Sequence, residues 1–221
     1  MNVAEALDTR YTCRVFKSDP VSRKTITKIL EAAIRAPSWA NTQPWELFVA
    51  AGSPLERVRQ GYLGNFHKGA PRNPDYPAPA EWPPTLQRRM RESRAKRFAA
   101  LGIDREDTVA RQAIAEQSFR LFGAPAIVYL CMDRTLTPWS IFDMGLLAQS
   151  IMLAARDQGV DSAPAAVLVA FPDILRAELD IPRELSILLG VALGYGDSDH
   201  PQNRYRSSRR PVQEVVRFRG Y

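Results

Sequence analysis

Residues 10–16 concentrate side chains that suit a doubly charged anion. Arg10 and Arg14 lie four residues apart, and Thr12 stands between them. A guanidinium group can form paired hydrogen bonds to two phosphate oxygens, and a hydroxyl group adds a further donor. The segment is therefore a candidate phosphate site, although two solvent-exposed arginines at the end of a helix would give the same pattern.

The segment of residues 36–45 is rich in amide and hydroxyl groups, including Ser38, Asn41 and Gln43, and it ends at Trp45. Amide side chains both donate and accept hydrogen bonds, so they can match the alternating donors and acceptors on the edge of a pyrimidine-like ring. In a structural interpretation, the same groups satisfy the backbone of a loop and Trp45 packs in the core. The pattern alone leaves both interpretations open.

A run of basic residues between positions 88 and 97 could bind an anion or a nucleic acid. A solvated helix face is the commoner origin of such a run, and this one lacks the interleaved aromatic residues that stack on bases. We therefore expect no nucleic-acid partner and keep a non-redox anion- or nucleic-acid-binding dimer as the alternative from a different class. The run consists of Arg88, Arg89, Arg91, Arg94, Lys96 and Arg97, with only Glu92 to oppose it.

Several familiar catalytic templates are missing from the sequence. It has no Gly-x-Gly-x-x-Gly segment after a strand, no Gly-Lys-Ser/Thr phosphate loop and no Gly-x-Ser-x-Gly elbow. His67 and His200 are the only histidines and have no second ligand at helical spacing, so we expect no metal site. Cys13 and Cys131 are expected to pack in the interior.

Length and composition indicate one domain in a soluble protein. The chain has 221 residues, 45% of them hydrophobic, and a formal net charge of +6, which is compatible with a nucleic acid, an anionic membrane or a phosphate as ligand. The start lacks the apolar core of a signal peptide, and two cysteines are too few for a disulfide framework. The most apolar stretch, residues 141–155, is shorter than the roughly 20 residues of a membrane span. We therefore expect a cytoplasmic protein without a membrane partner.

Hydrophobic periodicity predicts helices and strands in alternation around these segments. Ser22 is the expected N-cap of a helix that ends before Pro37, and Ser53 to Glu56 has the form of a capping box. Six prolines between residues 65 and 85 predict a long loop, and Gly159 suits the position directly after the buried central helix. The expected strands are residues 46–51, 126–132, 165–169 and 187–195, and the expected helices include residues 22–36, 88–98, 104–122, 141–155 and 172–179.

The last 26 residues, 196–221, differ from the rest of the chain. They are polar and rich in arginine, and Val215, Val216 and Phe218 alternate like an edge strand. Because this arm has no core of its own, it must lie on another surface.

Together the two polar segments resemble a known signature. Arg-x-Thr-x-Arg-x-Phe at residues 10–16, followed by Ala-Pro-Ser-x-x-Asn-Thr-Gln-Pro-Trp at residues 36–45, is similar to the paired signature of the FMN-dependent nitroreductase family. Residues 122–129 resemble the family's entry into its central strand, and residues 193–211 resemble its C-terminal arm. The Pro-rich loop and the basic stretch resemble the branch that reduces nitrobenzenes or nitrobenzoates.

The resemblance implies an α+β fold with a central mixed sheet flanked by helices, in a homodimer whose subunits exchange arms. Residues 1–195 would form the FMN-binding core, with a Pro-rich lid or insertion at about residues 62–103. Residues 196–221 would wrap around the partner subunit as part of the same domain. Two FMN sites would form at the interface.

The resemblance also assigns roles to individual residues. Arg10, Thr12 and Arg209 would meet the phosphate and the ribityl chain, and Arg14 would lie near N1 and O2 of the isoalloxazine ring. Residues 37–41 would come from the other subunit, and residues 164–166 would pass the reactive N5. The complete set of cofactor residues is Arg10, Tyr11, Thr12, Arg14, Pro37, Ser38, Trp39, Asn41, Pro164, Ala165, Ala166, Arg206 and Arg209.

The implied activity is a ping-pong reduction of a nitroaromatic compound to a hydroxylamine, with NADH or NADPH as the electron donor. The flavin would carry the redox chemistry, so no catalytic side chain is expected. A quinone reductase, a dehalogenase or an azoline dehydrogenase with the same fold is the alternative. The aromatic residues that could line the substrate pocket, or could equally pack in the protein, are Trp39, Phe66, Tyr76, Trp82 and Trp139.

Overall fold

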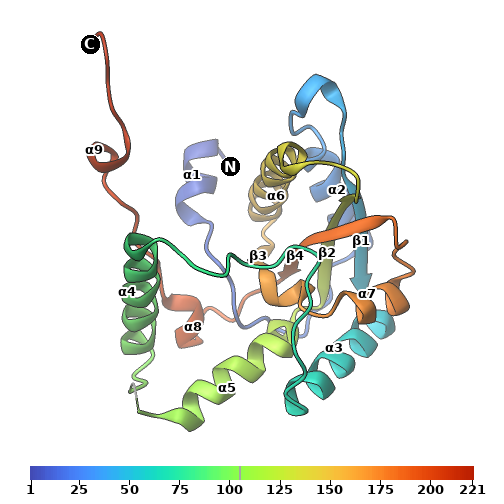
Figure 1. The fold of residues 1–221 in the computed structure, drawn as a ribbon. Helices are drawn as coiled ribbons and strands as arrows, with labels where there is room; N and C mark the ends of the chain where they lie inside the picture. Colours follow the sequence, from blue (N-terminus) through green and yellow to red (C-terminus); the bar gives the residue numbers. More distant parts are fainter. Residues whose placement is uncertain (105) are drawn as a thin grey trace.

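A four-stranded sheet forms the centre of the computed structural model, which describes residues 1–104 and 106–221 (Figure 1). The strand order is β1 (Glu46–Ala51), β2 (Ala126–Asp133), β4 (Leu185–Gly194) and β3 (Asp161–Ala165), and these neighbours pair antiparallel. An isolated parallel bridge joins Thr12 to Ser162. The predicted α+β fold is confirmed, and in the described part of the chain the parallel pairing is confined to this bridge.

Helices cover both faces of the sheet, and the alternation of side chains along β2 explains why. Ile127, Tyr129 and Cys131 point into one apolar cluster, which includes residues of α3 (Gly52–His67), α5 (Thr108–Phe119) and α7 (Pro172–Leu179). Val128 and Leu130 belong to the other cluster, with residues of α2 (Arg23–Ala33) and α6 (Pro138–Asp157). Because successive side chains of a strand point to opposite faces, a strand buried on both sides reads as a continuous apolar run.

Several predicted elements are confirmed close to their expected bounds. Strand β1 and helix α7 have the predicted limits, and the Ser22 hydroxyl accepts a hydrogen bond from the Thr25 N–H at the start of α2. Helix α6 is longer than predicted, and Gly159 follows it with a φ of +70°. The basic stretch forms α4 (Pro84–Ala100). Left-handed backbone at Gly159 is the expected end of a helix.

The predicted strand over residues 165–169 is wrong. Strand β3 comes earlier, and Ala166–Val169 forms the 3₁₀ helix η3. Leu168 of η3 packs over Gly190, where an added Cβ atom would lie 2.6 Å from the Leu168 Cβ. A short apolar run gives the same signal for a buried strand and a buried turn of helix, so the sequence could not separate them.

The predicted ends of two helices and the predicted tail strand also need correction. Helix α3 begins at Gly52 with Ala51 as its N-cap, so the capping box at Ser53 is wrong; no capping side-chain bond occurs there among the described residues. The helix predicted over residues 104–122 begins later, at Thr108, and gives way to η2 (Leu121–Gly123); residue 105 lies outside the described residues. Val215 ends the short helix α9 (Val212–Val215), and Val216 and Phe218 are exposed, so the edge strand is wrong.

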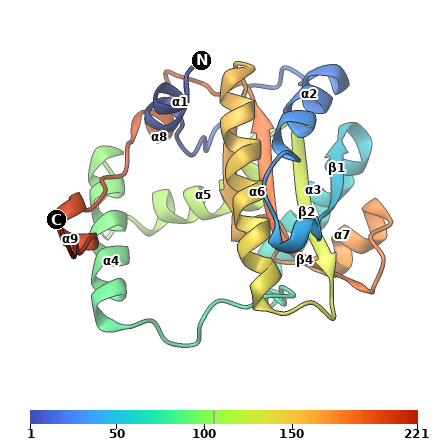
Figure 2. The ribbon, with the colours of Figure 1, turned by 90° about the horizontal axis from the view of Figure 1, so that it is seen from above.

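One side of the molecule is formed by segments that pack little against the sheet. Figure 2 shows α4 standing apart from α6, and Figure 1 shows α9 and the C-terminus extending beyond the end of α4. Every residue of α4 is at least partly exposed, as the described chain has it. Residues 68–83 connect α3 to α4 as the predicted Pro-rich loop, which is shorter than expected because α3 continues to His67. Helices α1 (Val3–Thr9) and α8 (Pro201–Arg204) lie between α4 and the sheet (Figure 2).

Asp75 anchors the Pro-rich loop. Its carboxylate accepts hydrogen bonds from Arg176 at 2.6 Å, from Arg134 at 3.2 Å and from the backbone N–H of Ile187 at 2.8 Å. Burial raises the pKa of Asp75, but these donors outweigh burial and hold its pKa below the usual value. The middle of the loop is thus fixed to β4 and α7.

Candidate functional site

Asn203 joins the N-terminal segment to the C-terminal arm. Its side-chain oxygen accepts hydrogen bonds from the backbone N–H groups of Arg14, at 2.8 Å, and Val15, at 3.3 Å. Its side-chain nitrogen donates to the carbonyl oxygens of Val15, at 2.7 Å, and Asp197, at 2.8 Å. Asn203 is 2% exposed, so loss of these bonds would leave buried polar groups unpaired. This residue fixes the two ends of the chain side by side.

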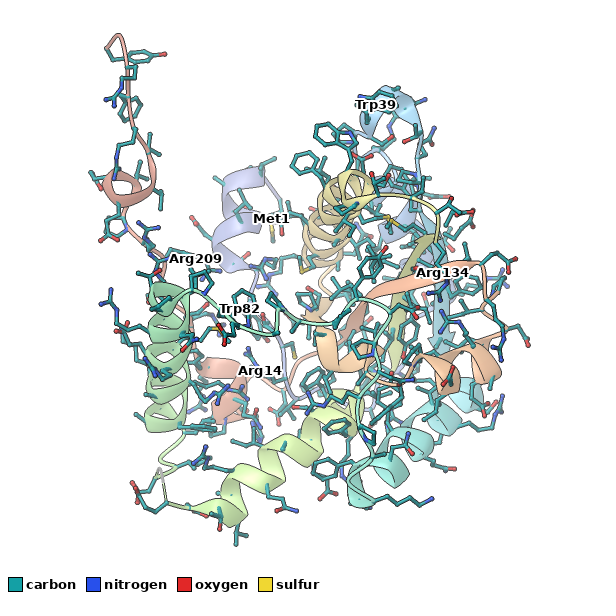
Figure 3. All side chains as sticks on the ribbon, in the orientation of Figure 1. Met1, Arg14, Trp39, Trp82, Arg134 and Arg209 are labelled. Carbon is teal, nitrogen blue, oxygen red and sulfur yellow. The ribbon has the colours of Figure 1, made fainter. Side chains whose placement is uncertain are left out.

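The two joined segments line a cleft of about 290 Å³, here called the arginine cleft. It brings together six of the residues that the sequence assigned to the cofactor, from both ends of the chain. Figure 3 shows Arg14 and Arg209 on the side of the molecule that carries α1, α4 and α8. The lining residues are Leu7, Asp8, Arg10, Tyr11, Thr12, Arg14, Tyr205, Arg206, Ser207 and Arg209.

The electrostatics of the arginine cleft suit an anion. Burial lowers the pKa of Arg10, and the neighbouring charge of Arg209 lowers it further. The Nε atom of Arg10 is buried and has no hydrogen-bond partner among the described residues. Within residues 1–104 and 106–221, Arg10, Arg14, Arg206 and Arg209 form no ion pair with a carboxylate. Converging guanidinium groups with a spare buried donor fit the phosphate of FMN.

Arg206 and Tyr11 form one wall of the cleft. The guanidinium carbon of Arg206 lies 4.0 Å from the centroid of the Tyr11 ring, which is a cation–π contact. Burial raises the pKa of the Tyr11 hydroxyl. Arg206 also donates to the backbone oxygens of Asn203 and Tyr205. It therefore holds the arm in place as well as adding positive charge.

Behind the cleft, the chain passes so closely that a side chain at position 196 would force its neighbours to shift. A Cβ atom on Gly196 would lie 2.7 Å from the Tyr11 hydroxyl and 2.8 Å from Asp161 Oδ2. The Gly196 N–H donates to Asp161 Oδ2 at 3.0 Å, and Asp161 Oδ1 pairs with Arg156 at 3.0 Å. The Cys13 N–H donates to the Ser162 oxygen, which places residues 10–14 alongside β3. Residues 164–166 continue from β3 into η3.

Residues 37–41 do not line the arginine cleft. Trp39 and Trp139 instead share another hollow of about 340 Å³, here called the tryptophan hollow. Figure 3 shows Trp39 at the top of the view, on the other side of α6 from Arg209. The backbone N–H of Trp39 donates to the buried Asp143 carboxylate at 3.2 Å, and the Ser38 hydroxyl accepts from the backbone N–H of Gln43 at 2.9 Å. The remaining lining residues are Thr42, Pro44, Thr135, Leu136, Thr137, Ser140 and Asp143.

The backbone of this segment is strained. Ala40, Asn41 and Gln43 have φ values of +47°, +58° and +47°, in the left-handed region that non-glycine residues seldom adopt. Such conformations persist only where surrounding contacts impose them, and they gather at functional sites. Trp39 is 63% exposed and Trp139 is 65% exposed, so two large rings are left open to a ligand or a partner.

The other aromatic candidates are dispersed. Phe66 stacks on Phe119 with ring centroids 4.8 Å apart, which gives it a packing role. Tyr76 and Trp82 lie on the loop of residues 68–83 and are 36% and 37% exposed. Their place at a substrate pocket stays a prediction.

Sequence reasoning missed Asn203 and Tyr205 and treated Arg97 as part of a solvated helix face. Arg97 is in fact half-buried and bonds to Gln202 at 2.8 Å. The sequence could not distinguish Arg97 from its neighbours, because its contact with Gln202 joins residues 105 positions apart and no local pattern contains such a contact.

The antiparallel sheet, the helices on both of its faces and the arginine cleft define an α+β protein with a candidate anion-binding site. Residues 7–195 match the family model described as "Nitroreductase family". The chain belongs to the nitroreductase family, so the resemblance read from its two polar segments is confirmed.

Two curated relatives are similar along almost their whole length. A nitrobenzene nitroreductase of Ectopseudomonas oleovorans is 33% identical over 209 residues, which cover 93% of this chain and 91% of the relative. A 4-nitrobenzoate reductase of Pseudomonas putida is 32% identical over 216 residues, covering 96% of this chain and 93% of the relative.

Solved structures agree in fold. The FMN and NADPH-dependent nitroreductase NfnB from Sphigopyxis sp. strain HMH superposes with a TM-score of 0.92 at 32% identity, covering 100% of both chains. The FMN-dependent nitroreductase NfnB from Mycobacterium smegmatis, solved in complex with NADPH, gives a TM-score of 0.91 at 31% identity, with 99% of this chain and 100% of the other covered.

Across residues 1–104 and 106–221, no helix combines the length and the apolar character needed to cross a membrane.

Proposed function

We propose that this protein is a flavoenzyme that binds FMN and reduces nitroaromatic compounds with electrons from NADH or NADPH. The observation that carries the proposal is the arginine cleft, where guanidinium groups from both ends of the chain converge without a carboxylate partner in the described residues. Family membership and relatives that act on nitroaromatic compounds support the choice of cofactor and substrate.

Arg10, Thr12 and Arg209 would bind the phosphate and the ribityl chain. The spare buried Nε of Arg10 supplies a donor that no acceptor among the described residues takes up. Arg206 and Tyr11 would close the side of the phosphate site. Arg14 would place positive charge near N1 and O2 of the ring, the edge that becomes negative when the flavin is reduced, and would thus favour the reduced state.

The second half of the site would come from a partner subunit in an arm-exchanged homodimer. Residues 37–41 lie far from the arginine cleft of their own chain, and the exposed rings of Trp39, Trp139 and Phe142 need a partner surface. Pro37, Ser38, Trp39 and Asn41 would therefore contact the flavin bound by the other chain. In this arrangement residues 1–195 are the core, residues 62–103 its lid or insertion, and residues 196–221 the arm.

The chemistry that FMN supplies when bound is uptake of a hydride from the nicotinamide and delivery of electrons to the acceptor, in a ping-pong order that takes a nitro group through nitroso to hydroxylamine. The backbone of residues 164–166 would lie near N5 and orient it. Trp39 and Trp139, with Phe66, Tyr76 and Trp82 as further candidates, would position the aromatic substrate by stacking and exclude water.

The purified protein tests the proposal directly. We expect it to show the absorbance of bound flavin, to lose that absorbance when NADH or NADPH is added without oxygen, and to regain it when 4-nitrobenzoate follows. Chromatography should identify a hydroxylamine as the product, and initial rates at varied concentrations of both substrates should give parallel double-reciprocal lines.

Different outcomes separate the alternatives. Reoxidation by quinones but not by nitroaromatic compounds would replace the substrate and retain the cofactor. Protein that takes up no FMN in equilibrium dialysis, and that shifts an oligonucleotide in a salt-dependent way, would replace the proposal with a non-redox anion-binding function.

A further inference from the structure

Arg97 differs from the other basic residues of α4. Its neighbours in the run, from Arg88 to Lys96, are exposed, whereas Arg97 is half-buried against the arm. Its Nη2 donates to the side chain of Gln202 at 2.8 Å, and Gln202 itself is 7% exposed. The Nε of Arg97 is buried and has no partner among the described residues.

Arg97 is linked to Arg14 through two neighbouring residues of α8, because Gln202 bonds to Arg97 and Asn203 bonds to the backbone of Arg14, and the charges of the two arginines interact. Burial lowers the pKa of Arg97 to about 10, and the charge of Arg14 is the next cause. Burial likewise lowers the pKa of Arg14, whose guanidinium donates only to the Thr12 carbonyl oxygen within the described chain. In residues 1–104 and 106–221, neither guanidinium forms an ion pair with a carboxylate. Two interacting, partly desolvated cations are unfavourable unless an anionic group joins them.

The contacts of Arg97 are also among those that hold α4 to the arm. The Tyr205 hydroxyl, 3.4 Å from the Ser93 carbonyl oxygen, makes another such contact. Gln202 precedes Asn203, whose side chain binds the backbone of Arg14. The short helix α8 therefore connects Arg14 to α4, so that a shift of one would be transmitted to the other.

We propose that Arg97 is a second cation at the ring end of the flavin site, where it acts with Arg14 to stabilise the negative charge that appears on reduction and ties helix α4 to that charge. This inference rests on the proposed binding of FMN. It assigns a redox-tuning role to one residue of the basic run and leaves the others as a solvated face.

The test compares Arg97→Gln with Arg91→Gln, which removes the same charge from an exposed position on the same helix. Affinity for oxidised FMN is measured by fluorescence titration of the apoprotein, and the midpoint potential is measured anaerobically against a reference dye. Arg97→Gln should weaken binding of oxidised FMN less than about threefold. It should lose about tenfold in preference for reduced FMN, which for two electrons equals a potential about 30 mV lower.

The matched variants make the outcome specific. Arg91→Gln should have the wild-type potential, and Arg97→Lys should recover most of the difference because it keeps the charge. If Arg97→Gln does not fold, Gln202→Ala removes the hydrogen-bond partner of Arg97, and it should lower the potential by a smaller amount.

Three results would overturn the inference: wild-type potential in Arg97→Gln, equal losses in Arg97→Gln and Arg91→Gln, or an unchanged potential in Gln202→Ala where that variant must be used. These results concern protein that binds FMN. Wild-type protein that binds no FMN would instead refute the proposed function itself, so the two failures are distinguishable.

Discussion

Replacement of Arg10 by methionine should have opposite effects on the apoprotein and on FMN binding. Arg10 is partly desolvated beside Arg209, and its buried Nε has no partner among the described residues. Leaving a buried donor unsatisfied costs about 1–3 kcal/mol, and partial exposure puts Arg10 at the low end of that range. Methionine fills similar space without the charge, so the apoprotein should gain about 1 kcal/mol, or a rise in melting temperature of about 2–4 °C for a domain of this size.

The same variant should bind FMN much more weakly. Loss of one partner of a desolvated charge pair costs about 2–5 kcal/mol. Since about 1.4 kcal/mol corresponds to a factor of ten, the dissociation constant should rise at least about 30-fold. Fluorescence titration of the apoprotein gives the affinity, thermal denaturation gives the stability, and Arg35→Met, at an exposed position, is the matched control. Unchanged FMN affinity in the Arg10 variant would refute the phosphate assignment, whatever happens to the melting temperature.

Three further predictions concern the cleft and its supports. Arg14→Gln should lower the midpoint potential of bound FMN with a smaller loss of affinity than Arg10→Met; equal potentials in variant and wild type would remove Arg14 from the ring edge. Gly196→Ala should destabilise the fold by about 1–3 kcal/mol, because its Cβ would overlap the Tyr11 hydroxyl, and a wild-type urea midpoint would contradict this close approach. Asp75 has a lowered pKa in the folded protein, so its stabilisation is present above the ordinary carboxyl pKa and is lost as pH falls through the folded value. Asp75→Asn should therefore be less stable than wild type at neutral pH and approach it in acid, as urea midpoints across the pH range would reveal; a constant gap would count against the anchoring role.

The sequence predicted best what is encoded locally. Strand β1 and helix α7 are bounded by prolines and polar residues, and their limits were correct. The spacing of Arg10, Thr12 and Arg14 is contained in five consecutive residues, so the arginine cleft could be anticipated from the motif. Family resemblance then linked this motif to the arm, which no periodicity would have done.

What the sequence could not predict depends on contacts between distant segments. Residues 166–169 have the apolar pattern of a strand, but they form a 3₁₀ helix in which Leu168 packs into the space left by the missing side chain of Gly190. Asn203 is an ordinary polar residue of the arm until its side chain is buried against Arg14 and Val15. Arg97 is one member of a charged run, and only docking of α4 on α8 separates it from the others.

The unfavourable charges in the cleft also have a thermodynamic consequence. Arg10 and Arg209 repel each other in the protein alone, yet a dianion placed between them would attract both. Relief of this repulsion would therefore contribute to the affinity for such a ligand. The fold maintains the repulsion because Asn203 fixes the segment that carries Arg14 and Gly196 allows the close approach behind it. Because a ligand that binds only the folded state raises stability by RT ln(1 + [L]/Kd), FMN should stabilise wild-type protein more than Arg10→Met at equal concentration. The order of the two melting temperatures should therefore reverse as FMN is added, a crossing that a merely structural role for Arg10 would not produce.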